Sequence, residues 1–455
     1  MVGDAPPSAA TGAERFAWSM YDFANSGYTT VVLTTVFNAY FVAVVAGGAE
    51  ISSGAATFLW TVTVATGNVI VLFSSPVIGA IADRHACKKR FLMFTTIGCI
   101  VTTGLLGFIG EGDFIAGVML LVLSLVMFAS GENLIAAFLP EIAPDQHMGR
   151  LSGYGWGLGY VGGLVTLGCC LTYITWAQNQ GQNPTQFIPV TLWITAVIFA
   201  AAALPTFLVL RERAIPMATT AGTSYLAEGF AQVRNTLRNA RRFKDLFRFL
   251  TTLVVFQAGV STVIVVAAIY AQEVLEFSSD ELVFLVMIVN ATAAVGALAI
   301  GHLQDRVGSC RALTLALSIW VIAIVLVFAA RSRGDIWLAA NLIGLAMGSS
   351  QSAGRALMGY FIPVARAGEF FGLWGLALRC AAIIGPATYG AISMLSGGNQ
   401  RMALLSTLGF FLLGLLLLAT VNEARGRRAA MLSNNHDRFR HGRISNGATG
   451  GETGA

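Results

Sequence analysis

The sequence predicts an all-α membrane protein with twelve transmembrane helices in two related six-helix bundles. Apolar residues make up 56% of the 455 residues and charged residues only 11%, less than half of the roughly 25% that is typical of soluble proteins. The apolar residues gather in twelve long runs, and landmarks of the first six runs recur in the last six. A soluble fold of this composition would expose aggregating apolar surface, so lipid is the expected solvent.

Each apolar run is long enough to cross a bilayer as a helix. A hydrocarbon core of about 30 Å requires about 20 helical residues. The expected helices cover residues 16–45, 55–82, 91–110, 117–139, 151–176, 187–210, 247–271, 281–303, 313–330, 336–362, 370–395 and 402–421. Lipid cannot satisfy an open sheet edge, and the alternating pattern of barrel strands is missing, so helices are predicted throughout.

The runs and their breaks predict five segments. These are an N-terminal tail (1–13), a six-helix bundle (14–210), a cytoplasmic linker (211–246), a second six-helix bundle (247–421) and a disordered cytoplasmic tail (422–455). In the linker, apolar residues recur at helical spacing opposite several arginines, namely at Leu226, Phe230, Val233 and Leu237. This pattern predicts a basic amphipathic helix on the anionic leaflet. A solvated tether with chance periodicity is the alternative.

The basic residues predict the orientation, because Lys and Arg gather in cytoplasmic loops. They cluster at 88–90, 150, 211–248, 306–311 and 425–443. Arg331 and Arg333 are the exception, since they fall on the opposite side. We therefore expect a multi-pass protein of the inner (plasma) membrane of a bacterium, with both termini in the cytoplasm.

Two pairs of landmarks indicate an internal repeat. Asp83 follows the second run and Asp305 follows the eighth, an offset of 305 − 83 = 222. Pro140 ends the fourth run and Pro363 ends the tenth, an offset of 363 − 140 = 223. Parallel halves of six helices, with a binding site at their interface, are a transporter architecture.

The loops at the first pair of landmarks share the pattern G-x-x-x-D-R-x-G, followed by basic residues. This pattern resembles the signature loop of the major facilitator superfamily, so the resemblance implies the major facilitator fold. The candidate gating residues are Gly79, Asp83, Arg84, Arg90, Gly301, Asp305, Arg306 and Gly308. In the first copy Ala86 stands where the second has Gly308. Asp83 and Asp305 could accept hydrogen bonds from a helix N-terminus, or pair with an arginine, when the cytoplasmic side is closed.

A narrower resemblance rests on the segments WSMYDFANS at 18–26, FLPE at 138–141, GRLSG at 149–153 and EFFG at 369–372. Together they are similar to the autophagy-related vacuole-effluxer branch, whose fungal member is linked to amino-acid export from the vacuole. This chain has Gly354 and Ala356 where that branch tends to have serines, and Arg379 where a lysine is common. These departures bear on the substrate more than on the fold.

Four charged residues lie away from the ends of the predicted helices: Asp22, Glu132, Arg355 and Arg379. Each costs about 2.5–3.5 kcal/mol to insert on translocon scales, so each is expected to face a cavity or a partner. The resemblance implies that helices 1, 4, 7 and 10 line the central cavity and that 3, 6, 9 and 12 form the scaffold. Predicted helices 3, 6, 9 and 12 contain no ionisable residue.

Glu132 and Arg355 occupy equivalent places in the repeat (355 − 132 = 223) and could meet across the cavity. Arg355 would hold a substrate carboxylate in a bidentate fork, and Glu132 would bind the substrate amine or a coupling proton. The alternative is a permanent ion pair that locks the two halves. Arg379 is a second candidate for anion recognition, or else a partner of Asp22 or of a helix carbonyl.

Asp22 is either a proton carrier or an acid that anchors its helix end. The neutral candidates for substrate contact or proton coupling are Asn25, Asn133, Gln351 and Trp374. Helix packing is the alternative role for each of them.

The combined pattern predicts a secondary active or facilitative transporter that moves a small solute by alternating access, with an amino acid or similar zwitterion as the first candidate. Expected partners are the solute, protons and the lipid bilayer, with no nucleic acid, and the chain is expected to act as a monomer. No phosphate loop, metal-ligand cluster or catalytic motif is present in the sequence, so neither a cofactor nor enzymatic activity is expected. A sugar, organic acid or drug-like cargo, a membrane enzyme using Glu132 and Arg355, and a transport-incompetent sensor are the alternatives.

Overall fold

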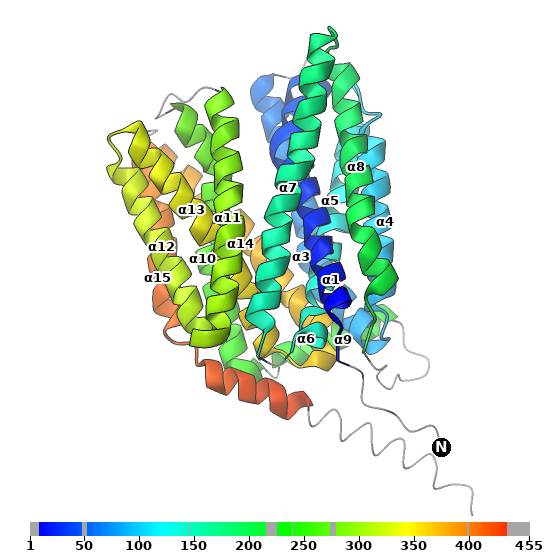
Figure 1. The fold of residues 1–455 in the computed structure, drawn as a ribbon, viewed down its shortest axis with the longest axis vertical. Coiled ribbons are helices and arrows are strands. Elements are labelled where there is room, and N and C mark those ends of the chain that lie inside the picture. Colours follow the sequence, from blue (N-terminus) through cyan, green and yellow to red (C-terminus); the bar gives the residue numbers. More distant parts are fainter. Residues whose placement is uncertain are drawn as a thin grey trace, which may run out of the picture.

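The computed structural model describes residues 9–47, 52–144, 146–214, 225–238, 240–273, 279–397 and 400–434, and the described part is helical with no strand (Figure 1). Within the described residues, ten helices are long and apolar enough to cross a membrane, and α15 (Gln400–Leu418) meets the same test together with the helix that follows it. The twelfth long helix is α13 (Arg333–Phe361), which has 29 residues and is less apolar, with most of them buried against neighbouring helices. The all-α, twelve-helix prediction is therefore confirmed.

The first bundle contains six spans, and its first span changes helical type along its length. In chain order the elements are α1 (Gly12–Tyr28), η1 (Thr29–Thr35), α2 (Val36–Tyr40), η2 (Phe41–Val45), α3 (Ser53–Arg84), α4 (Lys88–Leu106), α5 (Phe114–Ala136), α6 (Leu139–Ile142), α7 (Met148–Asn179) and α8 (Pro184–Val209). The elements η1 and η2 are π-helical. In η1 the hydroxyls of Thr34 and Thr35 donate to the carbonyl of Thr30 at 2.8 and 2.6 Å. Side-chain hydroxyls therefore hydrogen-bond to a backbone carbonyl of the widened turn.

The second bundle follows a linker that carries two short helices. In chain order the elements are α9 (Tyr225–Arg238), η4 (Ala240–Phe243), α10 (Lys244–Glu273), α11 (Ser279–Val307), α12 (Ser309–Ala329), α13 (Arg333–Phe361), η5 (Val364–Arg366), α14 (Ala367–Leu395) and α15 (Gln400–Leu418). A further helix covers Glu423–Asn434. The start of α1, α9 and this last helix lie at one end of the molecule, which we call the linker side (Figure 1).

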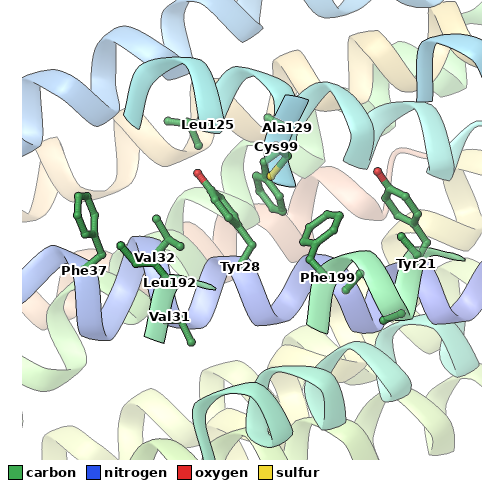
Figure 2. Close-up of a cluster of buried hydrophobic side chains, with 14 of the residues drawn as sticks. Tyr21, Tyr28, Val31, Val32, Phe37, Cys99, Leu125, Ala129, Leu192 and Phe199 are labelled. Atoms are coloured by element: carbon green, nitrogen blue, oxygen red, sulfur yellow. The ribbon is translucent and has the colours of Figure 1, made fainter. Parts of the chain in front are cut away.

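The core of the first bundle surrounds α1. Tyr21 and Tyr28 lie on one face of α1 and point toward α5 and α4 (Figure 2). The Tyr28 hydroxyl is 2.6 Å from Ser124 Oγ, and the ring stacks on Phe128 at 4.7 Å. The Tyr21 ring meets Phe199 of α8 edge-on at 6.1 Å. Because these buried tyrosine hydroxyls have hydrogen-bond partners, the core avoids the free-energy cost of burying an unpaired hydroxyl.

Glycines allow the two bundles to meet closely, at α3 with α14 and at α7 with α11. A Cβ added to Gly79 would lie 2.0 Å from the carbonyl oxygen of Gly368, and one added to Gly153 would lie 2.7 Å from the carbonyl oxygen of Ala297. These distances are too short for any side chain, so the seams require glycine. The two groups of helices come together toward the linker side and diverge toward the opposite end (Figure 1).

The position of α9 differs from the predicted rest on the leaflet. Its polar stripe faces the protein: Glu228 pairs with Arg84 of α3 at 3.2 Å, and Gln232 donates to Glu369 of α14 at 2.8 Å. Phe230, from the predicted apolar face, is 61% exposed, and the side chains of Leu226 and Leu237 lie outside the described set. The helix forms as predicted, but ion pairs and hydrogen bonds to both bundles set its orientation.

The prediction of disorder from residue 422 onward is wrong for the first part of that tail. Residues Glu423–Asn434 form a helix bent by 65° from α15. Arg425 donates to Asp245 at 2.7 Å, and Asn434 Oδ1 accepts from the backbone N–H of Val364 at 2.9 Å. These contacts with α10 and η5 stabilise the helix, although its polar composition had predicted disorder. Residues 435–455 lie outside the described residues.

Candidate functional site

The four ionisable residues predicted inside the membrane form two ion pairs, and each pair joins one bundle to the other. Arg355 of α13 pairs with Asp22 of α1, and Arg379 of α14 pairs with Glu132 of α5. Because both pairs link helices of the first bundle to helices of the second, we call the two pairs together the charged centre. An ion pair between bundles offsets the cost of burying each charge only while the bundles hold this arrangement.

Arg355 is held by more than its carboxylate. Its Nη2 lies 2.7 Å from Asp22 Oδ2 and donates to the Ser152 carbonyl at 3.0 Å, while its Nε donates to Ser152 Oγ at 3.2 Å. Trp18 and Trp156 lie 4.7 and 5.3 Å from the guanidinium carbon, so the cation also has two aromatic faces. These contacts fix the direction in which the guanidinium points.

A glycine on α7 makes room for the Arg355 pair. A Cβ at Gly155 would lie 2.2 Å from Asp22 Oδ2 and 2.5 Å from Arg355 Nη2. The helix backbone therefore forms one wall of the charged site. The glycine-rich stretch of α7 thus serves the site as well as the packing between the bundles.

The Arg379 pair has fewer partners and is more open. Arg379 Nη2 donates to Glu132 Oε2 at 3.0 Å, and Nη1 donates to Asn68 Oδ1 at 3.3 Å. The exposed fractions of the two side chains are 14% for Arg379 and 24% for Glu132, against 4% for Arg355 and 11% for Asp22. Because Glu132 faces Arg379 of the other bundle, its open surface borders the space between the bundles.

The structure does not join Glu132 to Arg355, the pairing that the repeat offset suggested. Equal depth in two related helices does not define how each helix is rotated, and α5 meets α14 more closely than α13. Arg355 instead takes Asp22, and Arg379 takes Glu132. The alternative in which Arg379 pairs with Asp22 is also not what the structure shows.

The neutral candidates differ in burial and in hydrogen bonding. Asn25 is 6% exposed, and its amide nitrogen and oxygen have no hydrogen-bond partner in the structure. Asn133 donates to Ser75 Oγ at 2.9 Å and keeps a free Oδ1. Trp374 is buried beside Phe371, with its indole N–H unpaired, whereas Gln351 is half-buried. Unsatisfied buried groups at such a centre suit water or a polar ligand.

The two gating loops make the same contact at the linker side, one between α3 and α14 and the other between α11 and α7. Asp83 accepts from the backbone N–H groups of Gly368 and Glu369 at 2.9 and 2.8 Å, at the start of α14. Asp305 accepts from Gly149 and Arg150 at 2.9 and 3.0 Å, at the start of α7. Each carboxylate therefore satisfies free N–H groups at a helix N-terminus of the other bundle.

A buried ion cluster supports the first gating loop. Lys88 is fully buried, pairs with Glu141, and lies 3.6 Å from Asp83 Oδ1. Glu212 accepts from the backbone N–H groups of Lys88 and Lys89 at 2.7 and 3.1 Å. The second loop has Gly308 in the left-handed region at φ 96°, which allows the turn from α11 into α12.

The remaining loop positions have separate surroundings. Arg84 pairs with Glu228 of α9, and Gly79 and Gly301 lie at the bundle seams, where an added Cβ would meet a backbone carbonyl. Arg90 and Arg306 are exposed at the linker side.

Several site residues escape reasoning from sequence. Ser152 holds Arg355 through both its hydroxyl and its carbonyl, and a serine in a glycine-rich run carries no distinguishing signal. Trp18 lies in the WSMYDFANS segment, and its spacing of four residues from Asp22 could have placed both on one helix face. Asn68 carries a weaker signal, as an amide inside an apolar helix.

Comparison with known proteins places these features in context. Residues 10–431 match the family model described as vacuole effluxer Atg22 like. The MFS-type transporter YxiO of Bacillus subtilis (strain 168) is 26% identical over 409 residues, covering 90% of this chain and 94% of YxiO. Autophagy-related protein 22-1 of Aspergillus fumigatus is 26% identical over 337 residues, covering 66% of this chain and 53% of that protein. The match thus spans about half the length of the fungal relative.

Solved structures share the fold at low sequence identity. The human organic anion transporter MFSD10 superimposes with a TM-score of 0.70 at 15% identity, covering 90% of this chain and all of that one (100%). The proton:xylose symporter XylE superimposes with a TM-score of 0.67 at 14% identity, covering 91% of this chain and 96% of XylE. These similarities establish the major facilitator fold.

Proposed function

We propose that this chain carries an amino acid or a similar small zwitterion. The chain belongs to the family of vacuole effluxer Atg22-like transporters within the major facilitator superfamily. The chain is a multi-pass membrane transporter, like its relatives, rather than an enzyme. The proposal rests on the two ion pairs that join the bundles. Two guanidinium groups and two carboxylates present the opposite charges that a zwitterion would replace.

The Glu132–Arg379 pair is the proposed substrate site. Its side chains are the more exposed of the two pairs, and among the described residues Arg379 has one carboxylate and one amide as partners. A substrate carboxylate binds Arg379 in a charge-assisted contact, and a substrate ammonium binds Glu132. The substrate then replaces one cross-bundle pair with two contacts of its own, so the bundles no longer depend on that pair.

The Arg355–Asp22 pair is proposed to hold the halves together and to respond to protons. Protonation of Asp22 or Glu132 would cancel the charge that faces an arginine and weaken the cross-bundle link. Asn25, Asn133, Gln351 and Trp374 are proposed to line the path or to hold water beside these groups. A proton is thus the candidate coupling ion.

The two gating aspartates supply the proposed conformational switch. In this structure they cap helices of the opposite bundle, and we propose that these caps hold the linker side closed. Rocking of the bundles breaks these hydrogen bonds, opens the linker side and closes the other end, which is alternating access. Gly79, Gly301 and Gly308 permit the close contacts, and Arg84, Arg90 and Arg306 provide basic groups at the same end.

The linker side is proposed to face the cytoplasm of a bacterium, with the protein monomeric in the plasma membrane. The arrangement of Lys and Arg supports this orientation, and the bacterial relative YxiO supports the location. The protein would then have five segments: an N-terminal tail, two bundles joined by a cytoplasmic linker, and a C-terminal tail.

An organic acid is the second candidate cargo, because the site contains two arginines and the organic anion transporter MFSD10 shares the fold. The two candidates differ in their need for Glu132. The ammonium group of a zwitterion binds the Glu132 carboxylate, whereas an organic acid has no ammonium group and gains nothing from Glu132.

A binding screen on purified protein separates these candidates. We expect amino acids to raise the melting temperature of wild-type protein, and Arg379→Gln to weaken binding at least tenfold, which corresponds to about 1.4 kcal/mol. Arg379→Lys keeps the charge and serves as the conservative control. Glu132→Gln should weaken zwitterion binding but not organic-acid binding. Equal stabilisation of wild type and Arg379→Gln by the same solute would contradict the proposed site.

A further inference from the structure

A polar cavity lies on the linker side, away from the cross-bundle ion pairs. It is formed where η4 and the first turn of α10 meet the helix Glu423–Asn434, and it encloses about 180 Å³. Its polar lining consists of Arg241, Arg242, Lys244, Asp245 and Arg425. Four cations and one carboxylate give the lining a formal charge of +4 − 1 = +3.

The single carboxylate of the cavity is already satisfied. Asp245 is buried and accepts from Arg425 Nη2 at 2.7 Å and from the backbone N–H of Asn422 at 3.0 Å. The Asp245 carboxylate therefore already binds the helix Glu423–Asn434, which we call the C-terminal helix. Within the described part of the chain, Arg241, Arg242 and Lys244 have no carboxylate partner and remain exposed. An anion is the missing counterpart of these three cations.

The cavity has an apolar floor beneath its basic rim. Phe243, Leu246 and Phe361 are each no more than 3% exposed, and all three line the cavity. Gly426 brings the C-terminal helix against Phe361, because an added Cβ would lie 2.6 Å from that ring. A rim of cations over an apolar floor suits a ligand with an anionic group and an apolar remainder.

The cavity also lies where a lipid could reach it. Met431 and Leu432 on the same C-terminal helix are 61% and 66% exposed, which is expected of a helix that rests at the bilayer interface. Basic pockets at the end of transmembrane helices are suited to phosphate-bearing headgroups. A merely solvated basic face would lack the enclosing wall that Arg425 and Gly426 create.

We propose that this cavity binds a phosphate-bearing anion through Arg241, Arg242 and Lys244. The guanidinium groups supply paired N–H donors to phosphate oxygens, and the ammonium group adds a point charge. The headgroup of an anionic phospholipid and free phosphate share this chemistry. The site is separate from the transport centre, and its occupancy ties the start of α10 to the C-terminal helix.

Binding measurements on the full-length protein in a neutral detergent test this site. Three probes are titrated by native mass spectrometry and by melting temperature: dioctanoyl phosphatidylglycerol, dioctanoyl phosphatidylcholine and inorganic phosphate. We expect one saturable anionic site in wild type. Arg241→Gln/Arg242→Gln should weaken it at least tenfold, and Lys244→Gln should weaken it severalfold. Arg234→Gln/Arg238→Gln is the matched control, because it removes two exposed charges from α9 outside the cavity.

The outcomes separate the sources of the anion. Tight binding of phosphatidylglycerol alone assigns the site to a lipid headgroup, and equal binding of inorganic phosphate assigns it to free phosphate. The proposal is overturned if no probe binds saturably, or if the pocket variants bind as wild type does. It is also overturned if the α9 control loses as much affinity as the pocket variants, since diffuse attraction to anions would then explain the binding.

Discussion

Arg355 and Arg379 show how differently two arginines can be placed within one centre. Arg355 has a carboxylate, a carbonyl, a hydroxyl and two aromatic rings around it. Arg379 has one carboxylate and one amide. An arginine with so many partners is costly to free, so it suits a structural link between the bundles. The more open arginine suits a ligand that must bind and leave.

Glu132 provides a residue-scale test of proton coupling. If its carboxylate binds the substrate ammonium only while ionised, uptake of a zwitterion should fall as the pH falls, because the neutral acid no longer attracts the ammonium group. Glu132→Gln mimics the protonated acid and should make uptake independent of pH. The measurement is initial uptake into proteoliposomes across a pH series. Glu111→Gln, in an exposed loop, is the control, and a pH dependence that survives in Glu132→Gln would remove this residue from coupling.

Ala86 provides a residue-scale test of the gating turn. It adopts φ 48°, in the left-handed region that favours glycine, and its second-copy counterpart Gly308 also has a positive φ, of 96°. That conformation costs a non-glycine residue about 1–2 kcal/mol. Ala86→Gly should therefore stabilise the protein by about 1 kcal/mol, a rise in melting temperature of about 2 °C. Ala143→Gly, at an ordinary φ of −77°, should bring no gain, and a lower melting temperature for Ala86→Gly would refute the strain.

At the scale of elements, hydrophobic length predicts the helices but not their orientation. Each of the twelve apolar runs coincides with a helix, because lipid leaves a backbone no other way to satisfy itself. The partner of Glu132 could not be predicted, since spacing fixes depth and leaves helix rotation open. The orientation of α9 and the helix at Glu423–Asn434 also depended on partners far away in sequence, such as Glu369 and Asp245.

The helix α9 is expected to stabilise closure of the linker side. Gln232 and Thr236 hydrogen-bond the side chain of Glu369, whose backbone N–H is capped by Asp83 of the other bundle. Gln232→Ala/Thr236→Ala should weaken this link and populate longer distances between the bundles at that end. Spin labels at Arg90→Cys and Arg306→Cys, in a cysteine-free background, report the distance by double electron–electron resonance.

The control for α9 is Arg234→Ala/Arg238→Ala, which changes the exposed side of the same helix. The control should keep the distance distribution of wild type. If both double variants behave alike, or if neither changes the distances, α9 is a tether and does not stabilise the closed state.

At the scale of the whole molecule, the two bundles are joined by contacts of two kinds. Backbone caps by Asp83 and Asp305 join the bundles at the linker side, and the ion pairs join them in the interior. Both kinds form between bundles, so both change when the bundles rock. We propose that the loops gate the transporter and that the interior recognises a zwitterion.

Counterflow in proteoliposomes tests that claim most directly. Vesicles containing purified protein are loaded with an unlabelled amino acid mixture and then given labelled amino acids outside, with sugar and organic-acid mixtures in parallel. We predict transient accumulation of a labelled amino acid by wild type, its loss in Arg379→Gln and its retention in Arg379→Lys. The proposed cargo is wrong if wild-type protein exchanges another class of solute but no amino acid. The proposed role of Arg379 is wrong if Arg379→Gln exchanges amino acids as wild type does.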